Sequence, residues 1–276
     1  MSFTIFLDML GFGNKVGGIS NEEEAKKFIL FMQSNKGIFD IIKTINQEDP
    51  FNIINENYEF KFSFISDSIV VLAYPKELDI AIAEDEYYNL SVYMFMSIYN
   101  KLLPLLFNLL KYKQILLRGA ISNKFSYIQN EFVVGEGLIE AYKLESKEYG
   151  AIYPRIVLSK NLTSDLKFME TLEKNSEELY KTDQNIITED KRDDFFFLNY
   201  FNLLQNQEQP HLNDNANISI SNKKFYDFHQ KAIQKMKLFM DSQKEKEDYK
   251  KIEIKYNWIR DYHNNHVPNE YKIIDK

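Results

Sequence analysis

The chain has 276 residues, 44% of them hydrophobic, and carries 34 Lys and Arg against 41 Asp and Glu, a formal net charge of −7. Because it contains no cysteine, disulfides, thiolate catalysis and Cys-ligated zinc are excluded, and four histidines confined to its last quarter argue against a His-rich metal site. The acidic balance argues against a general nucleic-acid binder, and the first residues show no basic leader, so we expect a soluble, cytoplasmic protein that binds neither nucleic acid nor membrane.

The N-terminal region predicts a strand followed by a helix. In residues 3–8 the two polar side chains, Thr4 and Asp8, fall on the same side of a two-residue alternation, which is typical of a strand. Ser20 followed by Glu23 forms a capping-box pattern, and the apolar spacing after it extends a helix to about residue 45. Residues 47–57 are expected to form a loop.

The middle of the chain predicts alternating strands and helices. Residues 58–66 and 69–74 are expected to form a hairpin around Asp67 and Ser68. Further elements are expected as a helix over 87–112 interrupted near Pro104, strands over 115–122 and 132–134, a helix over 138–146 and a strand over 155–158. The apolar stretch 102–110 is too short to span a bilayer.

The C-terminal part differs in composition from the rest. Residues 163–217 are polar and hard to assign, apart from an aromatic strand over 195–198. A long helix is predicted over about 222–250. We therefore expect an α+β fold, with a ferredoxin-type βαββαβ sheet and helices on one face in a domain of residues 1–165, and a helical C-terminal extension over 166–276.

Two aspartates stand in otherwise apolar strands. Asp8 and Asp67 would each cost several kcal/mol, roughly, to bury unless a cation or hydrogen-bond donors compensated the charge. Gly11 and Gly13 follow Asp8 closely and allow a ligand to approach the backbone. Paired carboxylates beside a glycine turn suggest a site for hard divalent cations and a phosphate chain. The alternative is that Asp8 caps a turn and Asp67 is a hairpin turn residue.

Four segments in order resemble class III nucleotidyl cyclases, and most resemble the pyrimidine cyclases of bacterial Pycsar antiphage defence. They are Phe6-Leu7-Asp8-Met9-Leu10-Gly11-Phe12, Phe64-Ile65-Ser66-Asp67-Ser68, Leu117-Arg118-Gly119-Ala120-Ile121-Ser122 and the segment 135–145 with its Ala141-Tyr142-Lys143-Leu144-Glu145 run. The late runs 255–258 and 262–264 also fit this group. The resemblance covers residues 3–160 well and the remainder weakly.

The resemblance implies metal-dependent cyclisation of a nucleoside triphosphate. It assigns Asp8, Asp67 and the main-chain carbonyl of Met9 to two Mn²⁺ or Mg²⁺ ions, which would stabilise the attacking and leaving oxygens. The amides of Gly11, Phe12 and Gly13 would bind the β- and γ-phosphates.

Two cationic side chains are candidates for the remaining charge stabilisation. Arg118 could clamp a phosphate or a base carbonyl, or could be a structural partner for a carboxylate on its own sheet. Lys143 stands where the family carries a transition-state arginine, and Ile139 stands where it carries a ribose-orienting asparagine. Lys143 could still supply charge to the α-phosphate, although it could equally be a solvated helix charge.

Ser63, four residues before Asp67, is the candidate residue for recognition of the base. Typical adenylate cyclases carry lysine at this position, so Ser63 favours a base other than adenine. Phe60, Phe62 and Phe64 could narrow the base pocket toward a pyrimidine, but a role in the strand core is the better interpretation. Nothing in the residues separates UTP from CTP, and the preference for UTP rests on the resemblance.

The resemblance also implies a homodimer with two equivalent sites, in which Asp8 and Asp67 of one chain face Arg118 or Lys143 of its partner. The cyclic pyrimidine nucleotide would act on a separate effector. Two other classes of function remain open: a non-catalytic nucleotide-binding module, and a scaffold that uses the C-terminal helix. Residues 222–260 hold eleven Lys and Arg against six Asp and Glu, although a solvated basic face explains this surplus more simply than nucleic-acid or membrane binding.

Overall fold

The computed structural model describes residues 1–39, 54, 56–76, 83–130, 132–146, 152–180, 185–206, 221–245, 247 and 249–275. Its strands are β1 (Phe3–Leu10), β2 (Tyr58–Ile65), β3 (Ser68–Pro75), β4 (Leu116–Ser122), β5 (Tyr127–Gln129), β6 (Phe132–Val134), β7 (Ile156–Leu158), β8 (Ile187–Asp190) and β9 (Phe195–Leu198). Its helices are α1 (Phe12–Val16), α2 (Glu22–Lys36), α4 (Glu84–Lys113), α5 (Glu136–Glu145), α6 (Lys160–Thr163), α7 (Leu166–Tyr180), α8 (Tyr200–Asn206), α9 (Asn222–Asp241) and α10 (Tyr249–His266), with short 3₁₀ turns at Gly37–Phe39 and Asn269–Tyr271.

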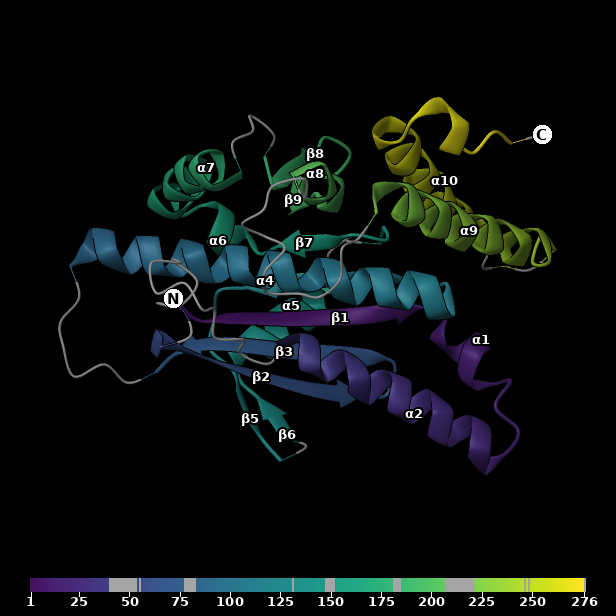
Figure 1. The fold of residues 1–276 in the computed structure, drawn as a ribbon, viewed down its shortest axis with the longest axis horizontal. Coiled ribbons are helices and arrows are strands. Elements are labelled where there is room, and N and C mark those ends of the chain that lie inside the picture. Colours follow the sequence, from purple (N-terminus) through teal and green to yellow (C-terminus); the bar gives the residue numbers. More distant parts are fainter. Residues whose placement is uncertain are drawn as a thin grey trace.

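One sheet organises the molecule, and β1 lies inside it (Figure 1). The strand order is β2-β3-β1-β4-β7-β9-β8, with a separate β5-β6 hairpin. β1 pairs antiparallel with β3 on one side and with β4 on the other. Because side chains alternate along a strand, Asp8 shares one face of β1 with Thr4 and Phe6, while Ile5 and Leu7 point to the other face.

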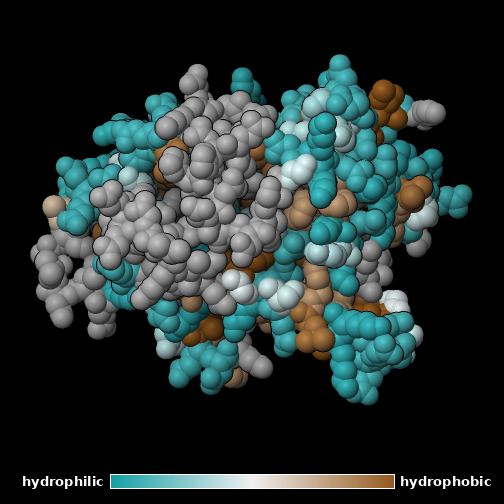
Figure 2. Space-filling view, viewed as in Figure 1, coloured by the Kyte–Doolittle hydropathy of each residue, from teal (hydrophilic) through white to brown (hydrophobic). Residues whose placement is uncertain are grey.

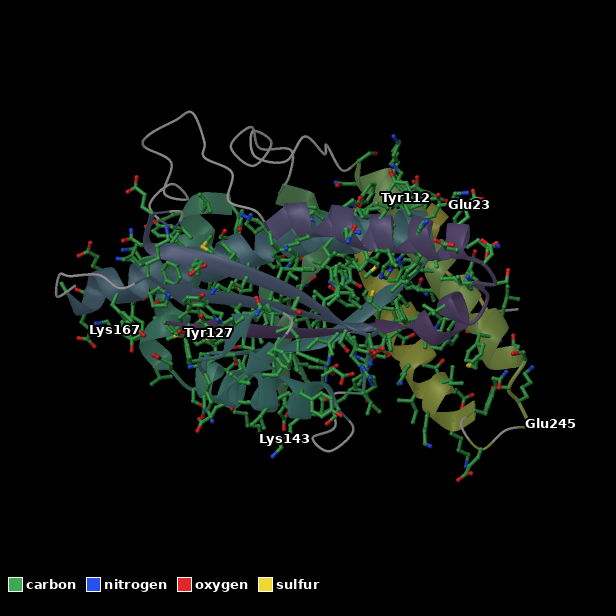
Figure 3. All side chains as sticks on the ribbon, turned by 90° about the horizontal axis from the view of Figure 1, so that it is seen from below. Glu23, Tyr112, Tyr127, Lys143, Lys167 and Glu245 are labelled. Atoms are coloured by element: carbon green, nitrogen blue, oxygen red, sulfur yellow. The ribbon has the colours of Figure 1, made fainter. Side chains whose placement is uncertain are left out.

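Helices cover both faces of this sheet (Figure 3). On one face α4 places Phe95 with its ring 5.8 Å from that of Phe3. α2 lies on the same face, where Asn108 Nδ2 of α4 donates to Asn35 Oδ1 at 3.1 Å. On the other face α5 places Tyr142 5.5 Å from Phe6, ring to ring. The α+β class is therefore confirmed, whereas the predicted ferredoxin-type arrangement with helices on one face is not: α5 covers the second face, and β7, β9 and β8 extend the sheet.

α4 is one continuous helix, although an interruption near Pro104 was expected. Proline removes one backbone hydrogen bond from a helix, and burial of the surrounding side chains against the sheet and α9 offsets that loss. Among the described residues α4 is long and apolar enough to cross a membrane by length and composition, but 78% of its apolar window is buried inside the protein. It is therefore the core helix of the fold.

Helix starts and ends differ from the sequence prediction in two places. α2 is capped by Asn21, whose side chain accepts from the Glu24 amide at 2.9 Å, one residue later than the predicted capping box. The predicted helix over 222–250 is divided into α9 and α10. The predicted helix end near residue 45 and most of the loop 47–57 lie outside the described residues.

The C-terminal region joins the same sheet and the same core. β9 confirms the predicted aromatic strand and pairs with β7, Val157 opposite Phe197. α9 packs on α4 through the rings of Phe107 and Phe228, which are 5.6 Å apart. The division of the chain at residue 165 stays a prediction. Among the residues coloured in Figure 2, most on this face are hydrophilic, and the hydrophobic ones form separate patches.

Candidate functional site

The ends of β1 and the β2–β3 turn bring Asp8 and Asp67 to one place. Asp8 is opposite Ser68 in the β1–β3 register, and the amide of Met9 donates to the carbonyl oxygen of Asp67 at 3.1 Å. The turn is formed with Ser66 in the left-handed region at φ 58°. Asp67 therefore lies directly beside Asp8 and Met9 of β1.

Arg118 is the first partner of Asp8. The two residues are opposite each other in the β1–β4 register, and Arg118 Nη2 lies 2.9 Å from Asp8 Oδ2. The same nitrogen also forms an ion pair with Glu145 at the end of α5. The side chains of Asp8, Arg118 and Glu145 are 18%, 12% and 6% exposed, so the three charges form a largely buried cluster.

The cluster holds two carboxylates and one guanidinium, and burial opposes the ionisation of both carboxylates. Desolvation raises the pKa of Asp8, the Arg118 guanidinium lowers it, and the Asp67 carboxylate raises it further. Desolvation likewise raises the pKa of Glu145, with Arg118 opposing it. Lys255 of α10 lowers the pKa of both carboxyl groups from a distance. Additional positive charge at this place would stabilise the ionised carboxylates.

These residues fit a hard divalent cation by their chemistry. Carboxylate and main-chain carbonyl oxygens are the donors that Mg²⁺ and Mn²⁺ prefer, and Asp8, Asp67 and the backbone of Met9 supply them. Within the described parts of the chain, no group of three or more His, Cys, Asp and Glu side chains is placed to hold a metal ion. A cation here would therefore take its remaining ligands from a substrate or water.

The glycine turn after β1 leaves its backbone accessible. Gly11 adopts φ 80°, a left-handed conformation that favours glycine, and precedes the short helix α1. A Cβ atom added at Gly11 or Gly13 would meet no atom within 4 Å. Phe12 lies against Phe28, ring centroids 5.5 Å apart, and so is held to one side. The backbone of Gly11 and Gly13 is therefore open on the side where a Cβ atom would stand.

Ser63 lies on the same sheet face as Asp8, because Ser63 pairs with Val70 and Val70 pairs with Phe6. Phe62 and Phe64 point to the opposite face, where the Phe62 ring is 5.1 Å from that of Phe39. These phenylalanines therefore belong to the core layer under the helices. They do not surround Ser63.

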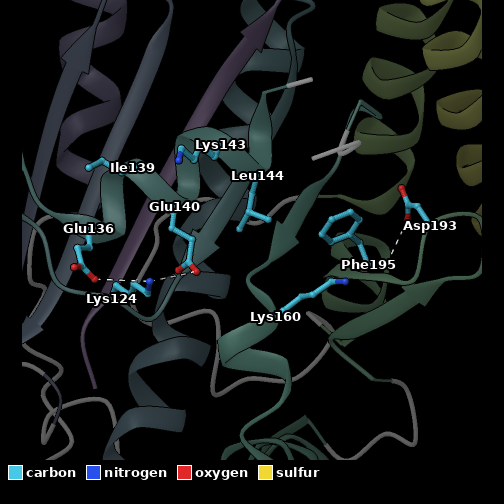
Figure 4. Close-up of a pocket in the computed structure, with 9 residues that line it drawn as sticks. All are labelled: Lys124, Glu136, Ile139, Glu140, Lys143, Leu144, Lys160, Asp193 and Phe195. Carbon is cyan, nitrogen blue, oxygen red and sulfur yellow. Dashed lines mark hydrogen bonds and ion pairs between the residues drawn. The ribbon is translucent and has the colours of Figure 1, made fainter. Parts of the chain in front are cut away.

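Lys143 is separated from the aspartates of its own chain. It lies on the outer face of α5 with Ile139, pointing away from the sheet (Figure 3), whereas Glu145 points inward to Arg118. A cavity of about 720 Å³ borders this face (Figure 4), lined by Lys124, Glu136, Ile139, Glu140, Lys143, Leu144, Lys160, Asp193 and Phe195. The structure thus brings Asp8, Met9, Asp67 and Arg118 together, and places Lys143 on another surface.

Glu145 and Lys255 were not identified from the sequence as members of this cluster. Glu145 had a detectable signal, because Ala141, Leu144 and Glu145 fall on one face of the predicted helix, which makes Glu145 an acid on an apolar face. Lys255 had no such signal, since its approach depends on how α10 packs.

Comparisons with known proteins give little beyond this geometry. No protein-family model and no curated protein matches the sequence. A solved structure, that of the guanylyl cyclase Cya2, matches with 13% identity over 72% of this chain and 90% of the other, at a TM-score of 0.29. A similarity at this level carries no argument about activity.

Proposed function

We propose that this protein is a metal-dependent nucleotidyl cyclase that converts UTP to 3′,5′-cyclic UMP and pyrophosphate. The observation that supports it most is the convergence of Asp8 and Asp67, brought together by the Met9–Asp67 backbone hydrogen bond at 3.1 Å and joined by electrostatic coupling. The resemblance of the surrounding segments to pyrimidine cyclases supplies the reaction class and the base.

In the proposed reaction the ribose 3′-hydroxyl gives its proton to solvent water and its oxygen bonds to the α-phosphorus, while the bond from that phosphorus to the bridging oxygen breaks and pyrophosphate leaves. Asp8, Asp67 and the Met9 carbonyl would hold two Mn²⁺ or Mg²⁺ ions, which supply Lewis-acid stabilisation of the attacking and leaving oxygens. The amides at Gly11–Gly13 would bind the outer phosphates, which their open surroundings permit.

Recognition of the base is assigned to Ser63, and stabilisation of the remaining phosphate charge is assigned to Arg118 and Lys143. Ser63 offers a short hydroxyl on the sheet face that carries Asp8. Arg118 balances the charge of Asp8 and would also face the substrate. CTP is the alternative substrate, since no described residue separates the two pyrimidines.

The active unit is proposed to be a homodimer, because Lys143 cannot meet Asp8 within one chain. An apolar surface supports this, formed by the β5–β6 hairpin with the preceding Phe125 and by Ile139 on the outer face of α5, and containing exposed Phe125, Phe132, Val134 and Ile139. Phe132 is 77% exposed, and exposed apolar side chains that gather in one patch mark protein interaction sites. A second copy seated here would bring its own Lys143 close to the interface.

The biological role follows from the resemblance. The cyclic nucleotide would act as a second messenger on a separate effector during defence against phage, and the enzyme would work in the cytoplasm. A non-catalytic nucleotide-binding module is the second candidate, because Arg118 already has carboxylate partners within its own chain and Ile139 cannot orient a ribose.

One experiment separates these candidates. The purified protein is incubated with Mn²⁺ and an equimolar mixture of the four ribonucleoside triphosphates, and products are identified by mass spectrometry beside a known cyclase. Cyclic UMP supports the proposal, and cyclic CMP changes the base. A cyclic purine nucleotide overturns the specificity, and no cyclic product with the control active favours the binding module.

A further inference from the structure

Glu145 is the most buried member of the charge cluster beside Asp8. Its side chain is 6% exposed, and it occupies the last turn of α5 on the face that Ala141 and Leu144 bury. Glu145 is thus fixed by the packing of a helix, and Asp8 by the pairing of two strands. Arg118 lies between these two rigid supports.

Arg118 uses one nitrogen for both carboxylates. Nη2 contacts Asp8 and Glu145, while Nε and Nη1 are buried and have no hydrogen-bond partner among the described residues. A guanidinium carries five N–H donors, so this arginine has unused donors that a small rotation could redirect. Its position is therefore set by the balance between the two carboxylates.

That balance matters to any cation at Asp8. A guanidinium paired with Asp8 alone would neutralise the carboxylate and repel a divalent ion at the same oxygens. A second carboxylate on the same nitrogen takes up part of the guanidinium charge, which leaves part of the Asp8 charge available to a cation. Without the carboxylate of Glu145, the whole charge of Arg118 would compete with the cation for Asp8.

We infer that Glu145 is a positioning residue that shares the guanidinium of Arg118 with Asp8, so that Asp8 is only partly neutralised and stays able to bind a divalent cation. This inference rests on the proposed function, because it takes Asp8 and Asp67 as cation ligands. Glu145 is not itself a ligand in it, in keeping with the absence of a three-carboxylate metal group among the described residues.

The test measures Mn²⁺ affinity without nucleotide, by electron paramagnetic resonance of the free ion. Glu145→Gln should weaken Mn²⁺ binding about tenfold, on the order of one charge–charge interaction in a largely buried site. Glu140→Gln is the matched control: it removes one negative charge from the same helix, and its carboxylate contacts Ser122 and Asn161 and has no contact with Arg118. It should change the affinity less than about threefold.

A double-mutant cycle separates an effect through Arg118 from a direct charge effect. In an Arg118→Gln background, Glu145→Gln should have little further effect, because the arginine that it positions is gone. An undiminished effect in that background would show that Glu145 acts on the cation directly and would overturn the inference. If Arg118→Gln does not fold, as judged by circular dichroism, the same cycle is run in an Arg118→Met background, which also removes the guanidinium and keeps a side chain of similar length.

The outcomes also separate this inference from the proposed function. A wild-type protein that binds Mn²⁺ and forms a cyclic nucleotide, with Glu145→Gln equal to Glu140→Gln in affinity, overturns the role of Glu145 alone. A wild-type protein that binds Mn²⁺ without turnover leaves the role of Glu145 measurable and removes the catalytic proposal. A wild-type protein that binds no Mn²⁺ overturns both.

Discussion

Asp8 and Arg118 lie opposite each other on β1 and β4, and their side chains form an ion pair with 2.9 Å between Nη2 and Oδ2. The charge of a candidate cation ligand is thus partly compensated by the protein itself. A buried carboxylate without a cationic partner would destabilise the metal-free fold. This pairing explains how the site can form before any ligand arrives.

Replacing Asp67 tests the catalytic proposal at a candidate site residue outside the buried ion pairs of Arg118. Asp67→Asn should lower the rate of cyclic product formation at least about 100-fold, because it removes a charged cation ligand. The side chain lies in the β2–β3 turn and is partly exposed, so the far-ultraviolet circular dichroism spectrum should not change. Full activity in this variant would contradict the assignment.

Mixing two inactive variants tests whether the site is shared between chains. Asp67→Asn and Lys143→Ala each damage one side of the proposed composite site. In a heterodimer of the two, one site recovers both wild-type residues, so random mixing should restore about a quarter of the wild-type activity. The measurement is product formation after equilibration of the two proteins. Mixtures no more active than their components would show that Lys143 does not act across a dimer.

The apolar surface on the β5–β6 hairpin and α5 provides a test without catalysis. Phe132→Glu should shift the protein from dimer to monomer in analytical ultracentrifugation, because it places a charge within the proposed interface. Leu166→Glu is the control, since Leu166 is similarly exposed, at 74%, but lies on α7. If both variants stay dimeric, the interface lies elsewhere.

The sequence predicted those parts of the site that local patterns determine. Asp8 and Asp67 were identified because each interrupts an apolar strand, and their meeting follows from the pairing of β1 with β3. The ion pairs of Arg118 could be weighed only as one of two alternatives, because the choice depends on which helix covers that face of the sheet. Helices on both faces bring Glu145 to Arg118, and no local pattern predicts such packing.

The C-terminal region shows the same limit more strongly. Arg155 gave no signal in the sequence, yet its side chain is fully buried, with Nη1 2.5 Å from Asp190 and Nη2 paired with Asp193. Trp258 of α10 donates to the same Asp190 at 2.6 Å. These partners come from segments far apart in the chain, so neither periodicity nor motif spacing could reveal them.

This buried arrangement predicts a large stability effect. Arg155→Met should lower the free energy of unfolding by about 3–5 kcal/mol, because it leaves Asp190 and Asp193 with no arginine between them. Arg192→Ala is the control, because Arg192 lies between Asp190 and Asp193 in the chain. Its side chain is 48% exposed and its ion-pair contacts are 4.0 Å long, so we expect a loss in the free energy of unfolding of about 0.5 kcal/mol or less. Urea denaturation measures both, and equal losses would contradict this role.

A chain of neutral histidines predicts how stability depends on pH. The carbonyl of Tyr271 can only accept, so His263 Nε2 donates to it across 2.9 Å. The Nδ1 of a neutral His263 must then accept from His229 Nδ1 at 3.0 Å, and His229 Nε2 accepts from the Tyr200 hydroxyl at 2.8 Å. Protonation of His263 would set two N–H groups against each other, and protonation of His229 would require the Tyr200 hydroxyl to turn and accept instead of donating.

Burial also lowers the pKa of His229 and of His263; the neighbouring His263 and His266 lower the pKa of His229 further, and His266 lowers that of His263. Because both folded pKa values lie below the unfolded value of about 6.5, the unfolded state binds more protons, and the stabilisation present above that pH is lost as the pH falls. We expect the free energy of unfolding to decrease below about pH 6.5 by up to about 1.4 kcal/mol per pH unit for each histidine. Urea denaturation between pH 5 and pH 8 measures this slope.

His229→Gln isolates the contribution of one ring. The glutamine carbonyl can still accept from Tyr200 but does not titrate, so the variant should be less stable than the wild type at pH 8 and show a slope lower by one histidine. Asp8 and Glu145, whose pKa values are raised, change stability in the opposite direction, and they cancel when the two slopes are compared. A variant with an unchanged slope would show that His229 is not held neutral in the folded protein.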